Sequence, residues 1–227
     1  MKQILFLGHY DKTDMMFYLG KLISMEHSVL IADATESKRY EYAYPKLDIE
    51  EDIHQYDGFD VMENVHSPTQ LKERIAETSY DYVLIDIDHL KNIQEWRSDD
   101  PLFLVTSLDN SVLQRNCQML NVLLEQSEAS ELKPITRIVQ RATDAFTEEY
   151  LDELLNHLPI QWHDTFVYYV DERDSARKIH NQFSNQISMS KLSGEYKSVL
   201  KQMASAILEI DDKEAGRLWK RTERRRK

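Results

Sequence analysis

Short apolar runs alternate along this chain with longer segments in which apolar residues recur at helical spacing. Runs such as QILFLG (3–8) and DYVLIDID (81–88) are typical of strands buried on both faces of a sheet. An apolar-faced helix is predicted from Thr13 to about Met25. Strands separated by single helices predict an α/β fold, a mostly parallel doubly wound sheet with helices on both faces.

The remaining elements follow from the same patterns. Further strands are predicted at 28–33, 102–108, 135–140 and, in shorter form, within 159–170, with an edge strand at 58–65. Helices are predicted from Ser67-Pro68 to about Thr78, from Asp109 or Asn110 to about Gln126, from about Thr147 to Leu158, and near 173–183 and 190–209. The polar, tyrosine-rich residues 34–57 are predicted as loops and a weak helix. We expect one domain over residues 1–210, followed by a basic C-terminal tail over 211–227.

The composition is that of a folded globular protein, with 41% hydrophobic and 30% charged residues among 227. The single Cys117 excludes an internal disulfide and a cysteine-based zinc site, which fits a reducing cytosol. The apolar stretch at the N-terminus is too short to predict a signal peptide or a membrane span. We therefore expect a cytoplasmic protein, with peripheral contact at the inner face of the membrane as an option for the tail.

The formal charge of −12 is unevenly distributed. Residues 217–227 contain seven basic residues and one acid, a charge of +6 that leaves −18 for the rest. An acidic body argues against a broad nucleic-acid-binding face. The tail is the candidate contact for an anionic membrane or another anion, and a solvated or docked helix end is the alternative. The residues predicted for this contact are Arg217, Trp219, Lys220, Arg221 and Arg224.

Residues 8–13, GHYDKT, follow a predicted buried strand and precede a helix, which is the position of a phosphate-binding loop. Such a loop needs glycine because its backbone N–H groups must close around phosphate oxygens. Gly8 begins the loop and Lys12 and Thr13 end it, but bulky residues fill the middle. Asp11 would repel a phosphate: two unit charges about 4 Å apart interact by roughly 4 kcal/mol at an effective dielectric of ~20.

Two predicted strands end in acids, Asp33 and Asp86. Ligands bind beyond the carboxyl ends of parallel strands, so we expect both acids near the loop. A carboxylate at a strand end suits magnesium, which makes Asp86 a candidate metal ligand. Capping of the next segment is the alternative for each acid. The candidate nucleotide site therefore comprises Gly8, Lys12, Thr13, Asp33 and Asp86.

Three segments carry a family resemblance: GHYDKT with the helix after it, YDYVLIDID, and LFLVTSLDNSVLQRNCQMLNVLLEQ. In order and spacing they resemble the MinD/ParA group of deviant Walker P-loop ATPases, over about residues 1–208. The resemblance implies that Lys12 is the phosphate lysine, Thr13 the magnesium hydroxyl and Asp86 the Walker B acid. Four other positions depart from the family pattern: Leu7 replaces the signature lysine, His9 and Asp11 replace glycines, and Thr35 replaces the second acid of D-x-D.

Because it lacks the loop glycines, the chain resembles the degenerate members of this group that act as localisation or assembly factors, such as the TadZ/CpaE type of pilus and secretion systems. The resemblance therefore implies a non-catalytic or very weak ATPase-like scaffold with no catalytic residues and no bound cofactor. It also implies protein partners from a larger, membrane-associated machine and a homodimer through the old nucleotide face. The alternative is a live switch that binds ATP with magnesium through Lys12, Thr13, Asp33 and Asp86. A third class, a DNA-partitioning protein, would need DNA binding by the tail.

Overall fold

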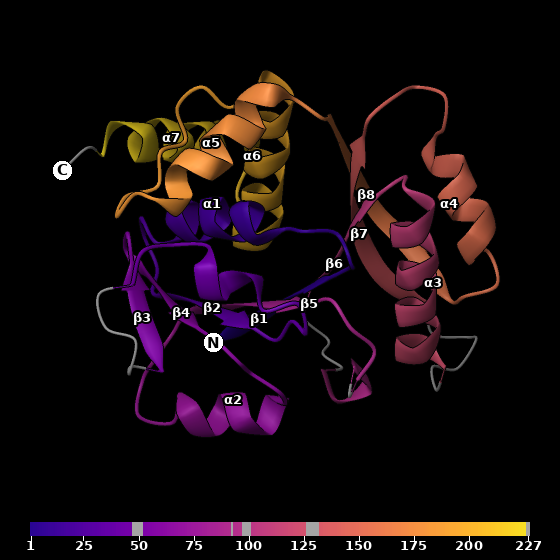
Figure 1. Cartoon of the computed structure of the whole chain (residues 1–227), viewed down its shortest axis with the longest axis horizontal. Helices are drawn as coiled ribbons and strands as arrows, with labels where there is room; N and C mark the ends of the chain where they lie inside the picture. The colour runs from indigo at the N-terminus through magenta and orange to yellow at the C-terminus, as the bar shows by residue number, and fades with distance from the viewer. Residues whose placement is uncertain (47–51, 92, 97–100, 126–131, 226–227) are drawn as a thin grey trace.

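The computed structural model describes residues 1–46, 52–91, 93–96, 101–125 and 132–225, and in these the chain forms one eight-stranded sheet (Figure 1). The strands are β1 (Lys2–Leu7), β2 (Val29–Asp33), β3 (Ile53–Tyr56), β4 (Phe59–Met62), β5 (Tyr82–Ile87), β6 (Leu102–Ser107), β7 (Lys133–Arg141) and β8 (Ile160–Tyr169). Their order is β3-β4-β2-β5-β1-β6-β7-β8, and every neighbouring pair is parallel except β3 and β4. The predicted fold class is confirmed.

Helices cover both faces of the sheet (Figure 1). They are α1 (Thr13–Ile23), α2 (Pro68–Arg74), α3 (Asn110–Leu124), α4 (Glu148–Leu155), α5 (Glu172–Gln182), α6 (Gly194–Leu208) and α7 (Asp212–Arg224), with the one-turn 3-10 helices η1 (Arg39–Tyr42) and η2 (Ile93–Trp96). Helices α1, α5, α6 and α7 lie together over one face, whereas α2, α3 and α4 pack into the core on the other. The connections between strands therefore run over both faces, which is what a doubly wound topology requires.

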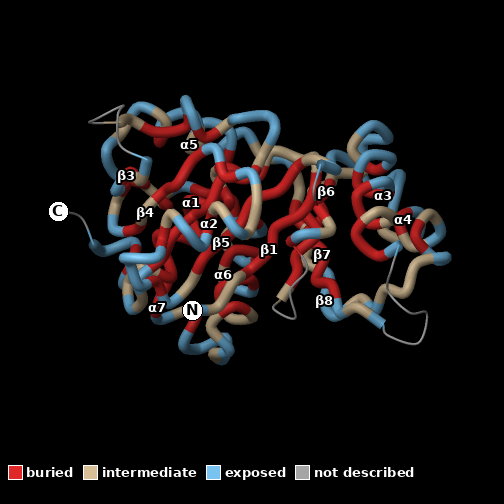
Figure 2. The backbone as a smooth tube through the Cα atoms, turned by 90° about the horizontal axis from the view of Figure 1, so that it is seen from below, coloured by how far each residue is buried: buried red, intermediate tan, exposed pale blue. Residues whose placement is uncertain are grey.

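Strand β1 shows why the central runs are apolar at nearly every position. Ile4 and Phe6 point into the core that contains α1, and Leu5 and Leu7 into the core that contains α3. All four are at most 2% exposed. Side chains alternate across a strand, so a strand covered on both faces has no position left for a polar residue. Figure 2 shows this central part of the sheet as buried.

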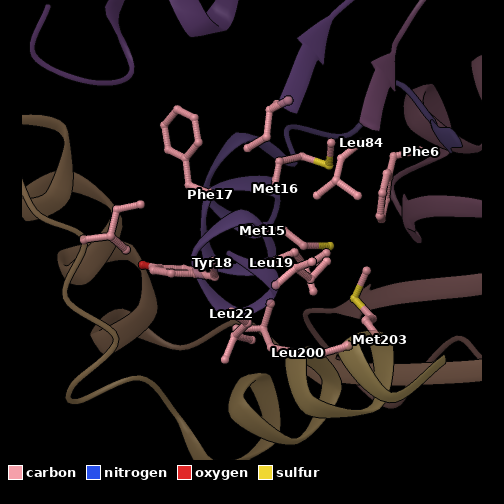
Figure 3. Packing of buried hydrophobic residues seen from close by; sticks show 14 of the residues in the cluster. Phe6, Met15, Met16, Phe17, Tyr18, Leu19, Leu22, Leu84, Leu200 and Met203 are labelled. Carbon is pink, nitrogen blue, oxygen red and sulfur yellow. The ribbon is translucent and has the colours of Figure 1, made fainter. Parts of the chain in front are cut away.

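Helix α1 is buried on almost all sides, not only along the predicted stripe, and Figure 3 shows it surrounded by apolar side chains. Met16 lies near Leu84 of the sheet, and Leu22 lies near Leu200 of α6. The helix therefore has the sheet on one side and the layer of α5, α6 and α7 on the other. A helix that is apolar all round is expected in such a position.

The outer strands differ from the sequence prediction. Residues 34–57 were predicted without a strand, but they contain β3, which forms the edge of the sheet beside β4. The hairpin turn is Asp57-Gly58, with φ values of 46° and 101°, and Asp-Gly is a hairpin signal that the prediction overlooked. The segment 58–65 is therefore not the edge, and β8 at ten residues is longer than predicted. The predicted helix end at Gln126 and the last two residues of the predicted tail lie outside the described residues.

The tail folds as helix α7, which packs against α6 and α1. Asp211 caps its N-terminus by accepting a hydrogen bond from the Glu214 N–H. Leu218 and Trp219 are 4% and 5% exposed and belong to the same core as α1. Burial of Trp219 corrects the expectation that its indole contacts a membrane, and the docked alternative describes the tail. Among the described residues, no helix has the combined length and hydrophobicity that a bilayer crossing requires.

We predict that Trp219→Ala lowers the free energy of unfolding by about 3–5 kcal/mol, because it opens a cavity in the core shared with α1. The neighbouring Lys220 is exposed, so Lys220→Ala should change the free energy of unfolding by less than ~0.5 kcal/mol. Urea denaturation of both variants measures the difference. Equal stabilities would mean that α7 is detached in solution.

Candidate functional site

The candidate site lies where β1, β2 and β5 end, as the sequence predicted for ligands of such a sheet. Gly8, directly after β1, has a φ of +134° and donates its N–H to the Ile87 carbonyl at 3.1 Å. A Cβ at this position would lie 2.1 Å from the Val105 carbonyl oxygen. Glycine is thus required here by the close approach of β6, whatever the loop binds.

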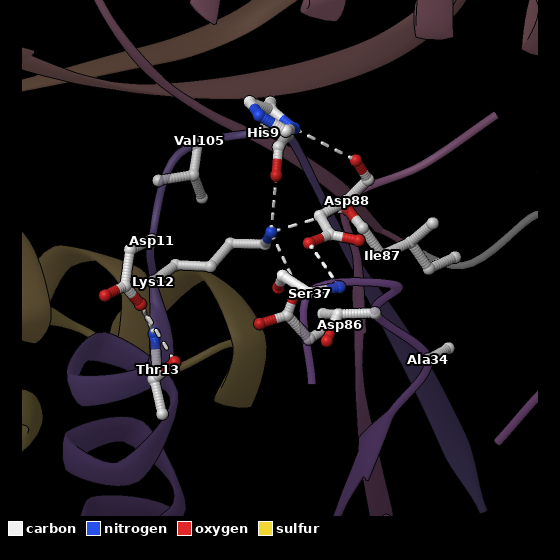
Figure 4. Close-up of polar contacts among 12 residues, drawn as sticks. His9, Asp11, Lys12, Thr13, Ala34, Ser37, Asp86, Ile87, Asp88 and Val105 are labelled. Carbon is white, nitrogen blue, oxygen red and sulfur yellow. Dashed lines mark hydrogen bonds and ion pairs between the residues drawn. The ribbon is translucent and has the colours of Figure 1, made fainter. Parts of the chain in front are cut away.

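Lys12 is fully engaged by protein atoms (Figure 4). Its Nζ lies 2.6 Å from Asp86 Oδ1 and donates to the Gly8 carbonyl at 2.7 Å. The Tyr40 hydroxyl donates to the other carboxylate oxygen of Asp86 at 2.8 Å. Both Lys12 and Asp86 are 2% exposed. Burial raises the pKa of the Asp86 carboxyl, and the ammonium of Lys12 opposes that rise.

Asp11 binds its own loop and α5. Its Oδ1 accepts hydrogen bonds from the backbone N–H and the hydroxyl of Thr13 at 3.2 and 2.9 Å. Its Oδ2 lies 2.6 Å from Lys178 Nζ, and Arg39 lies 3.6 Å from Oδ1. Although burial opposes it, Lys178 lowers the pKa of Asp11 to about 2, so this carboxylate stays ionised. The Thr13 hydroxyl, predicted as a magnesium ligand, is therefore already hydrogen-bonded within the loop.

Asp33 forms a local cap. Its Oδ1 accepts hydrogen bonds from the backbone N–H and the hydroxyl of Thr35 at 2.9 and 2.6 Å. Asp33 is also the register partner of Asp86 across β2 and β5, and burial raises its pKa to about 7. Asp33 therefore caps the segment that follows β2, which was the alternative to a role as a ligand. The structure brings the five predicted residues to one sheet edge, and Lys12, Thr13, Asp33 and Asp86 all have protein partners there.

Several residues that bind the side chains of this site were not predicted from the sequence. Tyr40 comes from the tyrosine-rich segment and Lys178 from α5, so their contacts with the site are distant in sequence. Asp88 was also missed as a site residue; its carboxylate accepts the backbone N–H groups of Glu36 and Ser37 at 2.7 and 3.3 Å. Only Asp88 had a local signal, since it is the last residue of a predicted strand.

The arrangement does not fit a magnesium–triphosphate group. The hollow between the loop and the strand ends, lined among others by Asp11, Lys12 and Asp86, has no room for a water molecule. The ammonium of Lys12 is neutralised by Asp86, and the hydroxyl of Thr13 is bound by Asp11. Among the described residues, no group of three or more His, Cys, Asp or Glu side chains is placed to hold a metal ion.

Comparison with known proteins defines the fold. No protein-family model and no curated protein sequence matches this chain. Solved structures do match. A ParA family ATPase from Chlorobium tepidum TLS aligns over 89% of this chain and 98% of that chain, with a TM-score of 0.63 and 15% identity. This chain has the ParA/MinD fold.

Two further structures with the ParA/MinD fold agree. A chain of the MinC:MinD cell division protein complex from Aquifex aeolicus covers 93% of this chain and 97% of its own, with a TM-score of 0.61 and 12% identity. The structure of a Cyanothece McdA variant in complex with ATP covers 93% of this chain and 97% of its own, with a TM-score of 0.58 and 17% identity. At these identities the similarity establishes the ParA/MinD fold, and activity has to be argued from the site.

We predict that Lys12→Met lowers the free energy of unfolding by about 3–5 kcal/mol, because it leaves the Asp86 carboxylate buried without its cation. The double variant Lys12→Met/Asp86→Asn should recover at least ~2 kcal/mol, since both charges are then absent. Lys2→Met is the control: it removes an exposed ion pair with Glu209 and should cost less than ~1 kcal/mol. Chemical denaturation of the three variants gives the values. A double variant no more stable than Lys12→Met would contradict a coupled pair.

Asp33 predicts a pH dependence of stability. Its pKa of about 7 in the folded protein exceeds the ordinary value of about 3.9, so the folded state binds the extra proton between these pH values. Stability from this group is therefore present below about pH 4 and is lost as pH rises to 7, by up to about 1.4 kcal/mol per pH unit. Asp33→Asn keeps the acceptor for Thr35 and should remove this slope. Denaturation of both proteins at pH 4 to 8 tests it; parallel profiles would refute the shift.

Proposed function

We propose that this chain is a non-hydrolysing scaffold with the ParA/MinD fold, which localises or assembles a larger membrane-associated machine of the pilus or secretion type. One observation carries the proposal: the lysine and the acid that would serve a nucleotide are buried together at 2.6 Å, with Tyr40 on the free oxygen of the acid. In this proposal Lys12 and Asp86 stabilise the fold and do not bind a nucleotide. A partner protein would bind to this fold, and no nucleotide would be hydrolysed.

Opening this site for a triphosphate would break several contacts at once. Lys12 would have to leave Asp86, and a buried carboxylate that loses its cation is strongly destabilising. Asp11 stays ionised beside the loop, where it would repel phosphate. Gly8, the single glycine of the loop, cannot supply the backbone donors that a phosphate needs. Its N–H already donates to the Ile87 carbonyl, and its Cα lies against the Val105 carbonyl.

Protein partners and a homodimer through the old nucleotide face belong to this proposal. A MinC:MinD complex shows that a protein of this fold assembles with a partner. Peripheral contact of the tail with an anionic membrane surface, through Arg217, Lys220, Arg221 and Arg224, is the alternative use of this helix, and it would not involve Trp219, which is buried. Since such a contact would rest on charge alone, it would be weak and salt-sensitive.

One observation favours the alternative of a live ATP-dependent switch. Lys12, Thr13 and Asp86 converge at the loop, and proteins of the same fold have been solved with ATP or AMPPNP: a variant of Cyanothece McdA and a putative plasmid partition protein from Borrelia burgdorferi B31. In that alternative, magnesium would replace Lys12 beside Asp86, and the nucleotide would draw Lys12 onto its phosphates. The scaffold and the switch therefore differ in whether Lys12 binds nucleotide.

Calorimetry and phosphate release separate the two functions. We predict that about 1 mM ATP with magnesium gives no saturable heat, which corresponds to a binding free energy weaker than about −4 kcal/mol. Phosphate release should equal that of Lys12→Met/Asp86→Asn, which lacks the lysine and should be more stable than Lys12→Met. Micromolar binding that this double variant loses would establish the switch and overturn the scaffold.

A further inference from the structure

The two ends of the molecule carry opposite charge. Helix α7 lies at one end of the longest axis and α4 at the other (Figure 1). Helix α7 belongs to the basic tail, whereas α4 begins with Glu148 and Glu149 and also carries Asp152 and Glu153. Because the whole protein is acidic, the basic end is the exception.

The outer face of α7 is a line of cations. Lys213, Arg217, Lys220 and Arg224 are spaced by four, three and four residues, so they project from one side of the helix. All four lie on the solvent side, and none forms an ion pair with a carboxylate in the described part of the chain. The opposite side of the helix, which holds Trp219, is buried in the core. We call these four residues the basic stripe.

The outer face of α4 has the complementary character. Glu149 and Glu153 lie four residues apart on the solvent side and have no cationic partner among the described residues, whereas Glu148 and Asp152 are paired with Arg141 and Arg137. Next to them, Phe146 and Tyr150 are 59% and 40% exposed. We call Glu149, Glu153, Phe146 and Tyr150 the acidic patch.

We propose that the basic stripe of one copy binds the acidic patch of a second copy, head to tail. Two carboxylates one helical turn apart match two cations one turn apart, such as Lys220 and Arg224. The two surfaces lie at opposite ends of the molecule, so this contact leaves a free stripe and a free patch and extends into an open chain. The proposal rests on the scaffold function and supplies one of its partners.

Neighbouring residues favour a second copy over an anionic membrane as the occupant of the stripe. Asp212, Glu214 and Glu223 lie on the same helix, and a uniformly anionic surface would repel them. Leu218 and Trp219 point into the core, so the helix offers no apolar anchor for a bilayer. A second copy offers the separate carboxylates of Glu149 and Glu153 together with two exposed aromatic rings. The same contact gives these carboxylates the cationic partners that they lack within one copy.

Exposed ion pairs each contribute little, so the association should be weak and salt-dependent. Sedimentation velocity from about 5 to 200 µM at low salt should show a weight-average size that rises without stopping at a dimer, and about 300 mM NaCl should reverse it. Glu149→Lys/Glu153→Lys and Arg217→Glu/Lys220→Glu should each weaken association at least about tenfold. An equimolar mixture of these two variants should associate again, because it restores the native stripe against the native patch.

Glu73→Lys/Glu77→Lys is the matched control: it makes the same charge change with the same spacing at exposed positions in and just after α2, and should leave association unchanged. Three results would overturn the proposal: a monomer throughout, equal loss in the control, or a mixture that stays monomeric. Binding of the wild type to vesicles with about 30% anionic lipid, without self-association, would also overturn it and make a membrane the occupant. None of these results bears on nucleotide binding, which tests the scaffold proposal separately, whereas a monomer throughout would also exclude the homodimer through the nucleotide face.

Discussion

A buried ion pair joins three segments of the chain at the carboxyl edge of the sheet, between its two apolar cores. Lys12 follows β1, Asp86 lies in β5 and Tyr40 comes from η1, so three segments distant in sequence meet at one carboxylate. A buried charge of this kind is tolerated only while its partner and its hydrogen bonds remain in place. The same contacts that stabilise the edge therefore occupy the groups that a nucleotide would need.

The segment that delivers Tyr40 is fixed by aromatic packing. Phe17 of α1 has four aromatic rings around it, with centroids 5.4 to 5.9 Å away: Tyr40, Tyr44, Tyr56 and Phe59. Aromatic pairs at such separations stabilise beyond their buried area. The tyrosine-rich segment is thus part of the core over α1, and this packing brings the Tyr40 hydroxyl to Asp86. Aromatic packing and the ion pair support each other.

Local sequence patterns were sufficient to predict the elements whose composition is the same whichever strand or helix lies beside them. Strands β1 and β5 are apolar wherever they lie in a parallel sheet, and residues 8–13 could be placed between a strand and a helix. Contacts between distant segments could not be predicted. Nothing in the sequence near Asp11 indicates Lys178, which is 167 residues away, and the burial of Trp219 depends on how α7 meets α1 and α6. The scarcity of glycine in residues 8–13 was visible in the sequence, whereas the side chains that contact this loop were not.

A crystal structure of the protein grown with millimolar magnesium and AMPPNP would show whether the loop can accept a nucleotide. If the ion pair excludes it, Lys12 Nζ stays within hydrogen-bond distance of Asp86, Asp11 stays paired with Lys178, and no density for a nucleotide appears above the loop. A triphosphate seated over Lys12, with Asp11 turned aside and magnesium beside Asp86, would contradict this exclusion.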